Sequence, residues 1–228
     1  MKMAGTEIVE PPARPAGLAA AVASSLVGLA IVRLWLVGDM DQAVYEQVLN
    51  LRTPWLTPLM NGITSLGSPA GMVVLAVLAG LALWRKLGRW ALASLPVAVV
   101  GASTTVELVL KATVDRVRPP TTQMLAPAHG SAFPSGHATV SAGLLVFLAL
   151  LAPMLVSRRW VRMVQTIAVI VTACIGLSRL YIGVHWSADV LAGWSIGAGI
   201  AAAAAVAAGR LNTTAEADSK VSKVTTEC

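Results

Sequence analysis

Charged residues are scarce in this chain. Only 12% of its 228 residues are Asp, Glu, Lys or Arg, whereas 56% are hydrophobic. A water-soluble domain carries roughly 25% charged residues, so this composition excludes the soluble classes. The mean hydropathy of +0.73 agrees with that conclusion. The composition therefore predicts an integral membrane protein.

Cysteine is scarce too, and metal-ligand patterns are missing. The two cysteines, Cys174 inside a hydrophobic run and Cys228 at the last position, give no disulfide framework. No group of Asp, Glu and His has the spacing of metal ligands. We therefore predict no metal site and no cofactor. The net charge of +6 does not indicate a nucleic-acid partner, because the basic residues fall between hydrophobic runs.

Hydrophobic runs are what the chain has in abundance. They cover about residues 18–37, 70–84, 90–110, 136–156, 161–177 and 188–208. A bilayer core needs roughly 20 apolar residues, so we expect the two shorter runs to extend outward by a few residues. Pro96 should kink the third run, and the glycines of the last run permit close helix packing. The sequence predicts an all-α fold, a bundle of six transmembrane helices.

The connector between the first two runs, residues 39–69, has a mixed character. Its apolar residues recur at helical spacing, which predicts a surface-lying or re-entrant helix; they are Trp55, Leu56, Leu59, Met60 and Ile63. Four carboxylates in the connecting segments are interpreted as solvated loop charges, namely Asp39, Asp41, Glu46 and Asp115.

The basic residues predict the orientation. They cluster after the second run, after the fourth run and in the C-terminal tail: Arg85, Lys86, Arg89, Arg158, Arg159, Arg162, Arg210, Lys220 and Lys223. Cytoplasmic loops are enriched in Lys and Arg, so these segments and both termini are predicted to be cytoplasmic. The segments 39–69, 111–135 and 178–187 then face outward.

This topology gives a simple domain organisation. We expect a flexible cytoplasmic tail at 1–16, one transmembrane domain at 17–209 and a second cytoplasmic tail at 210–228. The protein would be a multi-pass protein of the cell membrane.

Four basic residues break the topology rule. Lys111, Arg116 and Arg118 lie in one outward segment, and Arg179 lies in another. Cations at such positions are costly, so they indicate a function. Binding an anionic substrate is the simplest one.

Three strings in these outward segments resemble the signature motifs of one family. They run from Lys111 to Pro119, from Pro134 to His137 and from Ser178 to Asp189. In that order they resemble K-x6-R-P, P-S-G-H and S-R-x5-H-x3-D of the type 2 phosphatidic acid phosphatase (PAP2) superfamily, which also includes the vanadium haloperoxidases. All motif positions match over about 80 residues. The flanking runs are similar to the layout of small bacterial lipid phosphatases.

The resemblance implies catalytic roles for three residues. His185 would be the nucleophile that forms a phosphohistidine. His137 would be the general acid for the leaving lipid oxygen and then the base for water. Asp189 would orient the imidazole, since it lies four residues after His185 and shares its face if that segment is helical.

The resemblance also implies a phosphate-binding set. Lys111, Arg118 and Arg179 would stabilise the charge on the phosphoryl oxygens. Ser135 and Gly136 precede the fourth run, so their backbone N–H groups would lie at a helix N-terminus, where oxyanions bind well.

Three further residues have no motif role. Glu107, four residues before Lys111, either pairs with and aims Lys111 or snorkels near its helix end. Arg116 is interpreted as a lipid-headgroup contact. His129 is interpreted as an ordinary loop histidine.

The predicted function is a metal-independent membrane lipid phosphatase acting at the outer face. The family implies polyprenyl diphosphate, phosphatidic acid or phosphatidylglycerophosphate as substrate, and the outward site places undecaprenyl diphosphate slightly ahead. A lipid phosphotransferase using the same phosphohistidine stays open. A non-catalytic lipid-phosphate binder is disfavoured because both histidines are present, and a haloperoxidase because its known members are large soluble chains. We predict a membrane lipid phosphate as partner, and neither nucleic acid nor an obligatory protein partner.

Overall fold

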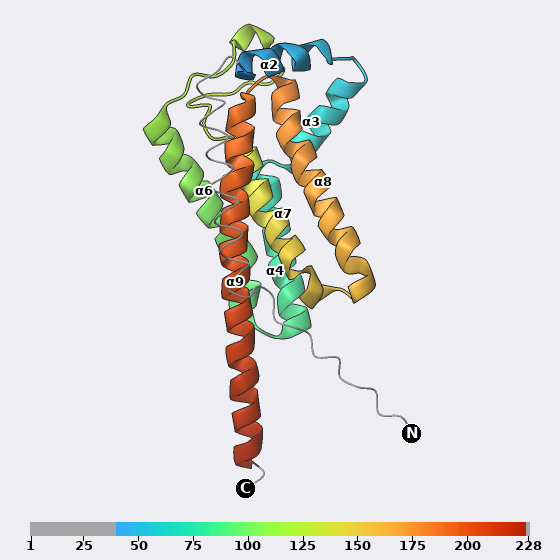
Figure 1. The fold of residues 1–228 in the computed structure, drawn as a ribbon, viewed down its shortest axis with the longest axis vertical. Coiled ribbons are helices and arrows are strands. Elements are labelled where there is room, and N and C mark those ends of the chain that lie inside the picture. Colours follow the sequence, from blue (N-terminus) through green and yellow to red (C-terminus); the bar gives the residue numbers. More distant parts are fainter. Residues whose placement is uncertain (1–39, 227–228) are drawn as a thin grey trace.

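The computed structural model of the chain describes the backbone of residues 40–226 and the side chains up to residue 213. This part contains helices and loops without any strand (Figure 1). The helices are α2 (Met40–Asn50), α3 (Leu56–Leu66), α4 (Pro69–Leu87), α5 (Trp90–Ala93), α6 (Leu95–Val114), η1 (Thr121–Gln123), α7 (Gly136–Leu155), α8 (Arg158–Ile182) and α9 (Ser187–Thr226). The predicted all-α fold is confirmed.

Helical segments long and apolar enough to cross a membrane match the predicted runs. Within residues 40–226 there are five, Pro69–Leu87, Trp90–Val114, Gly136–Leu155, Arg158–Ile182 and Ser187–Thr213. They correspond to five of the six runs, and the two short runs extend outward as expected. The run at 18–37 lies outside the described residues. The transmembrane character is confirmed, and the count of six is approximate.

The third run is interrupted close to Pro96, where a mild kink was expected. It forms the short helix α5 and the long helix α6, which meet at Ser94. Pro96 lies in the first turn of α6. A proline there costs no hydrogen bond, because the first N–H groups of a helix have no partner within it. Ser94 itself has helical φ and ψ, and its backbone bonds to Trp90 and Ala98 continue the helical pattern across the junction, so the angle of the expected kink stays a prediction.

Helix α7 is the centre of the bundle, in contact with α4, α6, α8 and α9. Of its most apolar stretch 61% is buried, against 22% to 39% for the other four segments. Two glycines of α9 let that helix approach closely, as predicted. A Cβ atom at Gly193 would lie 2.8 Å from the carbonyl oxygen of Ser135, and one at Gly197 would collide with that of Thr139.

The helix faces on the sides of the bundle, which point away from its core, are apolar. Large hydrophobic side chains are exposed along α4 and α8, among them Val74, Leu78, Val169 and Ile170. An apolar surface of this extent is unstable in water but is the normal surface of a helix in lipid. The burial pattern therefore agrees with the membrane assignment.

The helix ends that carry the three motifs meet at one end of the bundle, which we call the motif end. It comprises the C-termini of α6 and α8 and the N-termini of α7 and α9. Helix α2 lies across it, and α3 slopes down from it beside α8 (Figure 1). Helix α3 is the helix predicted from the connector as surface-lying or re-entrant, whereas α2 was not predicted. Lys111 and Arg179 lie in the last turns of α6 and α8 and not in loops. Helix α9 continues to Thr226, through most of the predicted tail at 210–228.

Candidate active site

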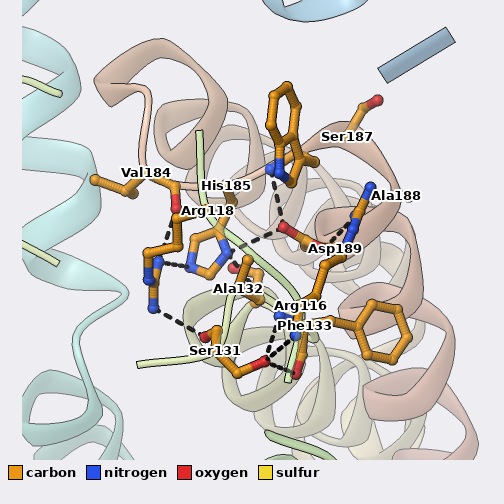
Figure 2. Close-up of polar contacts among 12 residues, drawn as sticks. Arg116, Arg118, Ser131, Ala132, Phe133, Val184, His185, Ser187, Ala188 and Asp189 are labelled. Carbon is orange, nitrogen blue, oxygen red and sulfur yellow. Dashed lines mark hydrogen bonds and ion pairs between the residues drawn. The ribbon is translucent and has the colours of Figure 1, made fainter. Parts of the chain in front are cut away.

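His185 lies in the short connection between α8 and α9. Its side chain is only 2% exposed, and Figure 2 shows it between Arg118 and Asp189. Nδ1 lies 2.8 Å from the carbonyl oxygen of Ala132. A carbonyl oxygen can only accept, so Nδ1 carries the proton and Nε2 keeps its lone pair. Nε2 lies 3.4 Å from Nη1 of Arg118.

The imidazole of His185 is neutral at physiological pH. Burial lowers its pKa from 6.5 to about 4, and although Asp189 raises it, the Arg179 and Arg118 cations add to the lowering. Desolvation disfavours the charged form of a histidine. The ring is therefore available as a nucleophile and is not lost to protonation at neutral pH.

Asp189 contacts His185, but not through the shared helical face that the sequence predicted. Helix α9 begins at Ser187, so His185 precedes it and the two residues do not share a helical face. The helical-spacing argument was therefore wrong. The side chains still meet, because Oδ2 of Asp189 accepts from the Trp186 N–H at 2.9 Å and lies 3.5 Å from Nδ1 of His185. The nearest acceptor to Nδ1 is the Ala132 carbonyl.

Arg118 is held rigidly by backbone carbonyl groups. It donates to Gly130 at 3.0 Å, Val184 at 2.7 Å, His129 at 3.1 Å and Ser131 at 3.1 Å. An arginine has five N–H donors, and the fifth, on Nη1, donates to the Nε2 lone pair of His185 at 3.4 Å. Burial lowers the pKa of Arg118, which nevertheless stays protonated. Arg118 therefore offers a fixed charge and one donor instead of a free two-pronged fork.

Arg179 is the more available guanidinium. It is 9% exposed, and its Nη1 donates to Oγ1 of Thr64 on α3 at 2.7 Å. Its Nε is buried with no partner among the described residues. A buried donor without a partner is costly, and an oxyanion would satisfy it. The Thr64 contact was missed from the sequence because Thr64 lies in no motif.

Lys111 pairs with Glu107. This contact favours the interpretation that Glu107 pairs with and aims Lys111 over the interpretation that it snorkels near its helix end. Nζ of Lys111 lies 2.8 Å from Oε1 of Glu107. The same carboxylate packs on Gly136, where a Cβ atom would lie 2.5 Å from Oε1. A side chain at position 136 would therefore displace the carboxylate of Glu107 from this place. Ser135 precedes α7, as predicted, and its Oγ is buried with no partner among the described residues.

His137 is the second residue of α7 and is half-buried. It lies within electrostatic range of Arg179, His185 and Lys111, so it belongs to the same cluster. His129 is exposed in the loop, as interpreted from the sequence. No group of three His, Cys, Asp or Glu side chains suited to a metal ion was found in the described part of the chain.

Two sequence interpretations were wrong. Asp41 is not a solvated loop charge, because it lies on α2 and is only 7% exposed. Arg116 is not a headgroup contact, because its guanidinium pairs with Asp41 and Asp189, each at 2.5 Å. Burial opposes the charge of Arg116, but the two carboxylates outweigh burial and raise its pKa.

Relatives of known sequence agree with this architecture. The chain is 34% identical over 165 residues to phosphatidylglycerophosphatase B of Bacillus subtilis, a match that covers 71% of this chain and 79% of that protein. It is 37% identical over 68 residues to an undecaprenyl-diphosphatase of Sulfolobus acidocaldarius, covering 30% of this chain and 29% of that protein.

Two solved structures and one family model are also similar to this chain. The crystal structure of a transmembrane PAP2-type phosphatidylglycerolphosphate phosphatase from Bacillus subtilis superposes with a TM-score of 0.75 at 29% identity, covering 81% of this chain and 93% of that one. Aquifex aeolicus LpxE shares the fold with a TM-score of 0.56 at 22% identity, covering 73% and 94%. The PAP2 superfamily model matches residues 91–212. With the three motifs gathered at one end of such a bundle, the chain belongs to the PAP2 superfamily, and it is a phosphatase of that type.

Proposed function

We propose that this phosphatase removes the terminal phosphate of a membrane lipid through a phosphohistidine at His185, without a metal ion. One observation carries the proposal. The buried imidazole donates from Nδ1 to the Ala132 carbonyl and keeps its Nε2 lone pair beside Arg118. This is the tautomer that a nucleophilic histidine needs.

In the first step, the Nε2 lone pair of His185 forms a bond to phosphorus while the bond from phosphorus to the lipid oxygen breaks. His137 donates a proton to the departing oxygen. In the second step, His137 takes a proton from water, the water oxygen bonds to phosphorus, and the N–P bond breaks. Phosphate leaves, and His185 is again neutral with its Nδ1 proton in place.

The transferring phosphoryl group carries negative charge, which the site offsets with its own cations. We name Lys111, Arg118 and Arg179 the cation cluster. The unpartnered Nε of Arg179 is a donor for a phosphoryl oxygen, and the Arg118 N–H that points to Nε2 of His185 becomes one when Nε2 bonds to phosphorus. Donors that are fixed before the reaction stabilise the transition state without reorganisation. The backbone N–H groups at the start of α7 add to them.

For the substrate we favour a phosphate monoester of the phosphatidylglycerophosphate type. The similarity to phosphatidylglycerophosphatase B covers 79% of that relative, whereas the similarity to the undecaprenyl-diphosphatase covers 29% of its length. This order reverses the slight preference drawn from the sequence.

A substrate panel tests the proposal. Purified protein in detergent with excess chelator is incubated separately with phosphatidylglycerophosphate, phosphatidic acid and undecaprenyl diphosphate. Free phosphate and phosphorylated lipid are both measured. We expect free phosphate, most rapidly from phosphatidylglycerophosphate. Transfer to a second lipid would instead identify a phosphotransferase, and binding without turnover would identify a lipid-phosphate binder.

We also propose that the motif end faces the outside of the cell, because Arg85, Lys86 and Arg89 end α4 and precede α5 at the opposite end. In a background with Cys174 and Cys228 replaced by alanine, Thr122→Cys should react with a membrane-impermeant thiol reagent in intact cells. Arg159→Cys should react only after the membrane is opened. Both positions are exposed, so access depends on the side of the membrane. The opposite labelling pattern would place the site inside.

Arg179 should contribute through the shape of its guanidinium as well as its charge. Arg179→Lys keeps the charge but loses the Nε donor, so turnover should fall about 30-fold, which corresponds to about 2 kcal/mol for a charged hydrogen bond. Inhibition by vanadate, which adopts the five-coordinate geometry of the transition state, should weaken in parallel.

The matched control for this variant is Arg158→Lys, an exposed position at the other end of the same helix. It should match the wild type in turnover and vanadate inhibition. If Arg179→Lys also matched the wild type in both, Arg179 would be a juxtamembrane cation and not a phosphate ligand.

A further inference from the structure

Asp41 is a buried carboxylate that belongs to none of the three motifs. It lies in the first turn of α2. Its Oδ1 accepts from the Ala188 N–H at 2.9 Å and from the Ser187 hydroxyl, and its Oδ2 pairs with Nη2 of Arg116 at 2.5 Å. Both oxygens are therefore used, one on the first residues of α9 and the other on Arg116.

Arg116 connects Asp41 to the nucleophile. Its second terminal nitrogen, Nη1, pairs with Oδ1 of Asp189 at 2.5 Å, and Oδ2 of Asp189 lies 3.5 Å from Nδ1 of His185 (Figure 2). Asp189 is fully buried. A continuous set of charged groups thus runs from α2 through Arg116 and Asp189 to the imidazole, with little water to screen it.

The charge balance of this set matters for the proposed reaction. When Nε2 bonds to phosphorus, positive charge develops on the ring. Asp189 favours that charge, whereas Arg116 opposes it. Asp41 offsets Arg116, because the set then holds two carboxylates and one guanidinium and is net negative. Without the charge of Asp41 this set is neutral, and it no longer offsets the Arg118 and Arg179 cations that also act on the developing imidazolium.

We propose that Asp41 is a positioning residue for the nucleophile, acting through Arg116 and Asp189 to keep this set of three charges net negative on the Nδ1 side of the His185 imidazole, opposite Arg118. The inference rests on the proposed function, in which His185 attacks phosphorus. Helix α2 then has a function in catalysis besides covering the motif end, although it shares no motif with the rest of the site.

The test is Asp41→Asn, which removes the charge but leaves an amide oxygen that can still accept from Ala188. Substrate labelled in its terminal phosphate and rapid quenching give the rate of phosphoenzyme formation. We expect about a 10-fold loss, the size typical when a carboxylate supporting a functional histidine is changed. The inhibition constant of inorganic phosphate should not change, because it reports the cation cluster, which Asp41 does not contact.

Two control variants separate this role from a purely structural one. Tyr45 lies one turn after Asp41 on α2, and its ring packs against Trp186. Tyr45→Phe keeps this ring and removes only the hydroxyl, which has no hydrogen-bond partner among the described residues. It should match the wild type. Ser187→Ala breaks the hydroxyl contact between α9 and Asp41 but leaves the charge on Arg116 in place. It should also form the phosphoenzyme at the wild-type rate.

Three results would overturn the inference. They are a normal rate in Asp41→Asn, an equal loss in Ser187→Ala, and a weakening of phosphate binding in proportion to the lost rate. The last two would show that Asp41 holds the fold and does not act through charge. A wild-type protein that releases phosphate but forms no phosphoenzyme would instead refute the proposed function, so the two failures are distinguishable.

Discussion

Replacing His185 with alanine should abolish both turnover and phosphoenzyme formation. The expected loss of rate is on the order of 10,000-fold or more, because the variant lacks the imidazole that bonds to phosphorus in the proposed first step. Phosphoenzyme is measured by acid-labile label retained on the protein after rapid quenching. Substrate binding should persist, because the cation cluster is intact in this variant.

The chain offers a matched control for this variant. His129 is an exposed loop histidine outside the motifs, and only its carbonyl group contacts Arg118. His129→Ala should therefore turn over as the wild type does. An active His185→Ala variant would remove the proposed mechanism altogether, because no phosphohistidine could then form at this position.

The second large effect is expected at His137, and it should depend on the leaving group. Protonation of the departing oxygen contributes roughly 100-fold to 10,000-fold when that oxygen is a poor leaving group. His137→Ala should therefore slow hydrolysis of a lipid monoester by a factor in this range. With a lipid diphosphate the leaving group is a lipid phosphate, which is stable without protonation. The rate of phosphoenzyme formation from it should therefore fall much less in this variant.

The two steps must be measured separately for this comparison. Phosphoenzyme formation reports the acid role of His137, whereas phosphoenzyme decay reports its base role toward water. We expect decay to slow equally for both substrates, since they give the same phosphohistidine. Equal losses in the formation step for monoester and diphosphate would count against His137 as the general acid.

The sequence by itself determined the class of protein and the position of most helices. Apolar runs of about 20 residues must be helical in lipid, because a helix satisfies its backbone hydrogen bonds within one segment. Five of the runs accordingly became helices with ends shifted by a few residues. These signals are local in the chain, so composition and spacing were enough to find them.

The motifs likewise identified which polar residues gather at one end. Lys111, Arg118, His137, Arg179 and His185 were predicted as one set, and the structure brings them to the motif end. The order of motifs along alternating helices explains this success. Segments at the end of one membrane helix and the start of the next lie on the same side of the bilayer.

Only the tertiary structure decided how the set is held together. Asp41 lies 75 residues from Arg116 along the chain and 147 from Ala188, yet it contacts both. Thr64 and Arg179 are 115 residues apart, and the carbonyl groups that hold Arg118 come from two separate segments. The contacts of Asp41 and Thr64 depend on how α2 and α3 pack against α8 and α9. Those of Arg118 depend on how the loop before α7 meets the connection between α8 and α9. No local spacing encodes either arrangement. Because this packing buries Asp41, its carboxylate needs a charged partner and hydrogen bonds, and Arg116 is that partner.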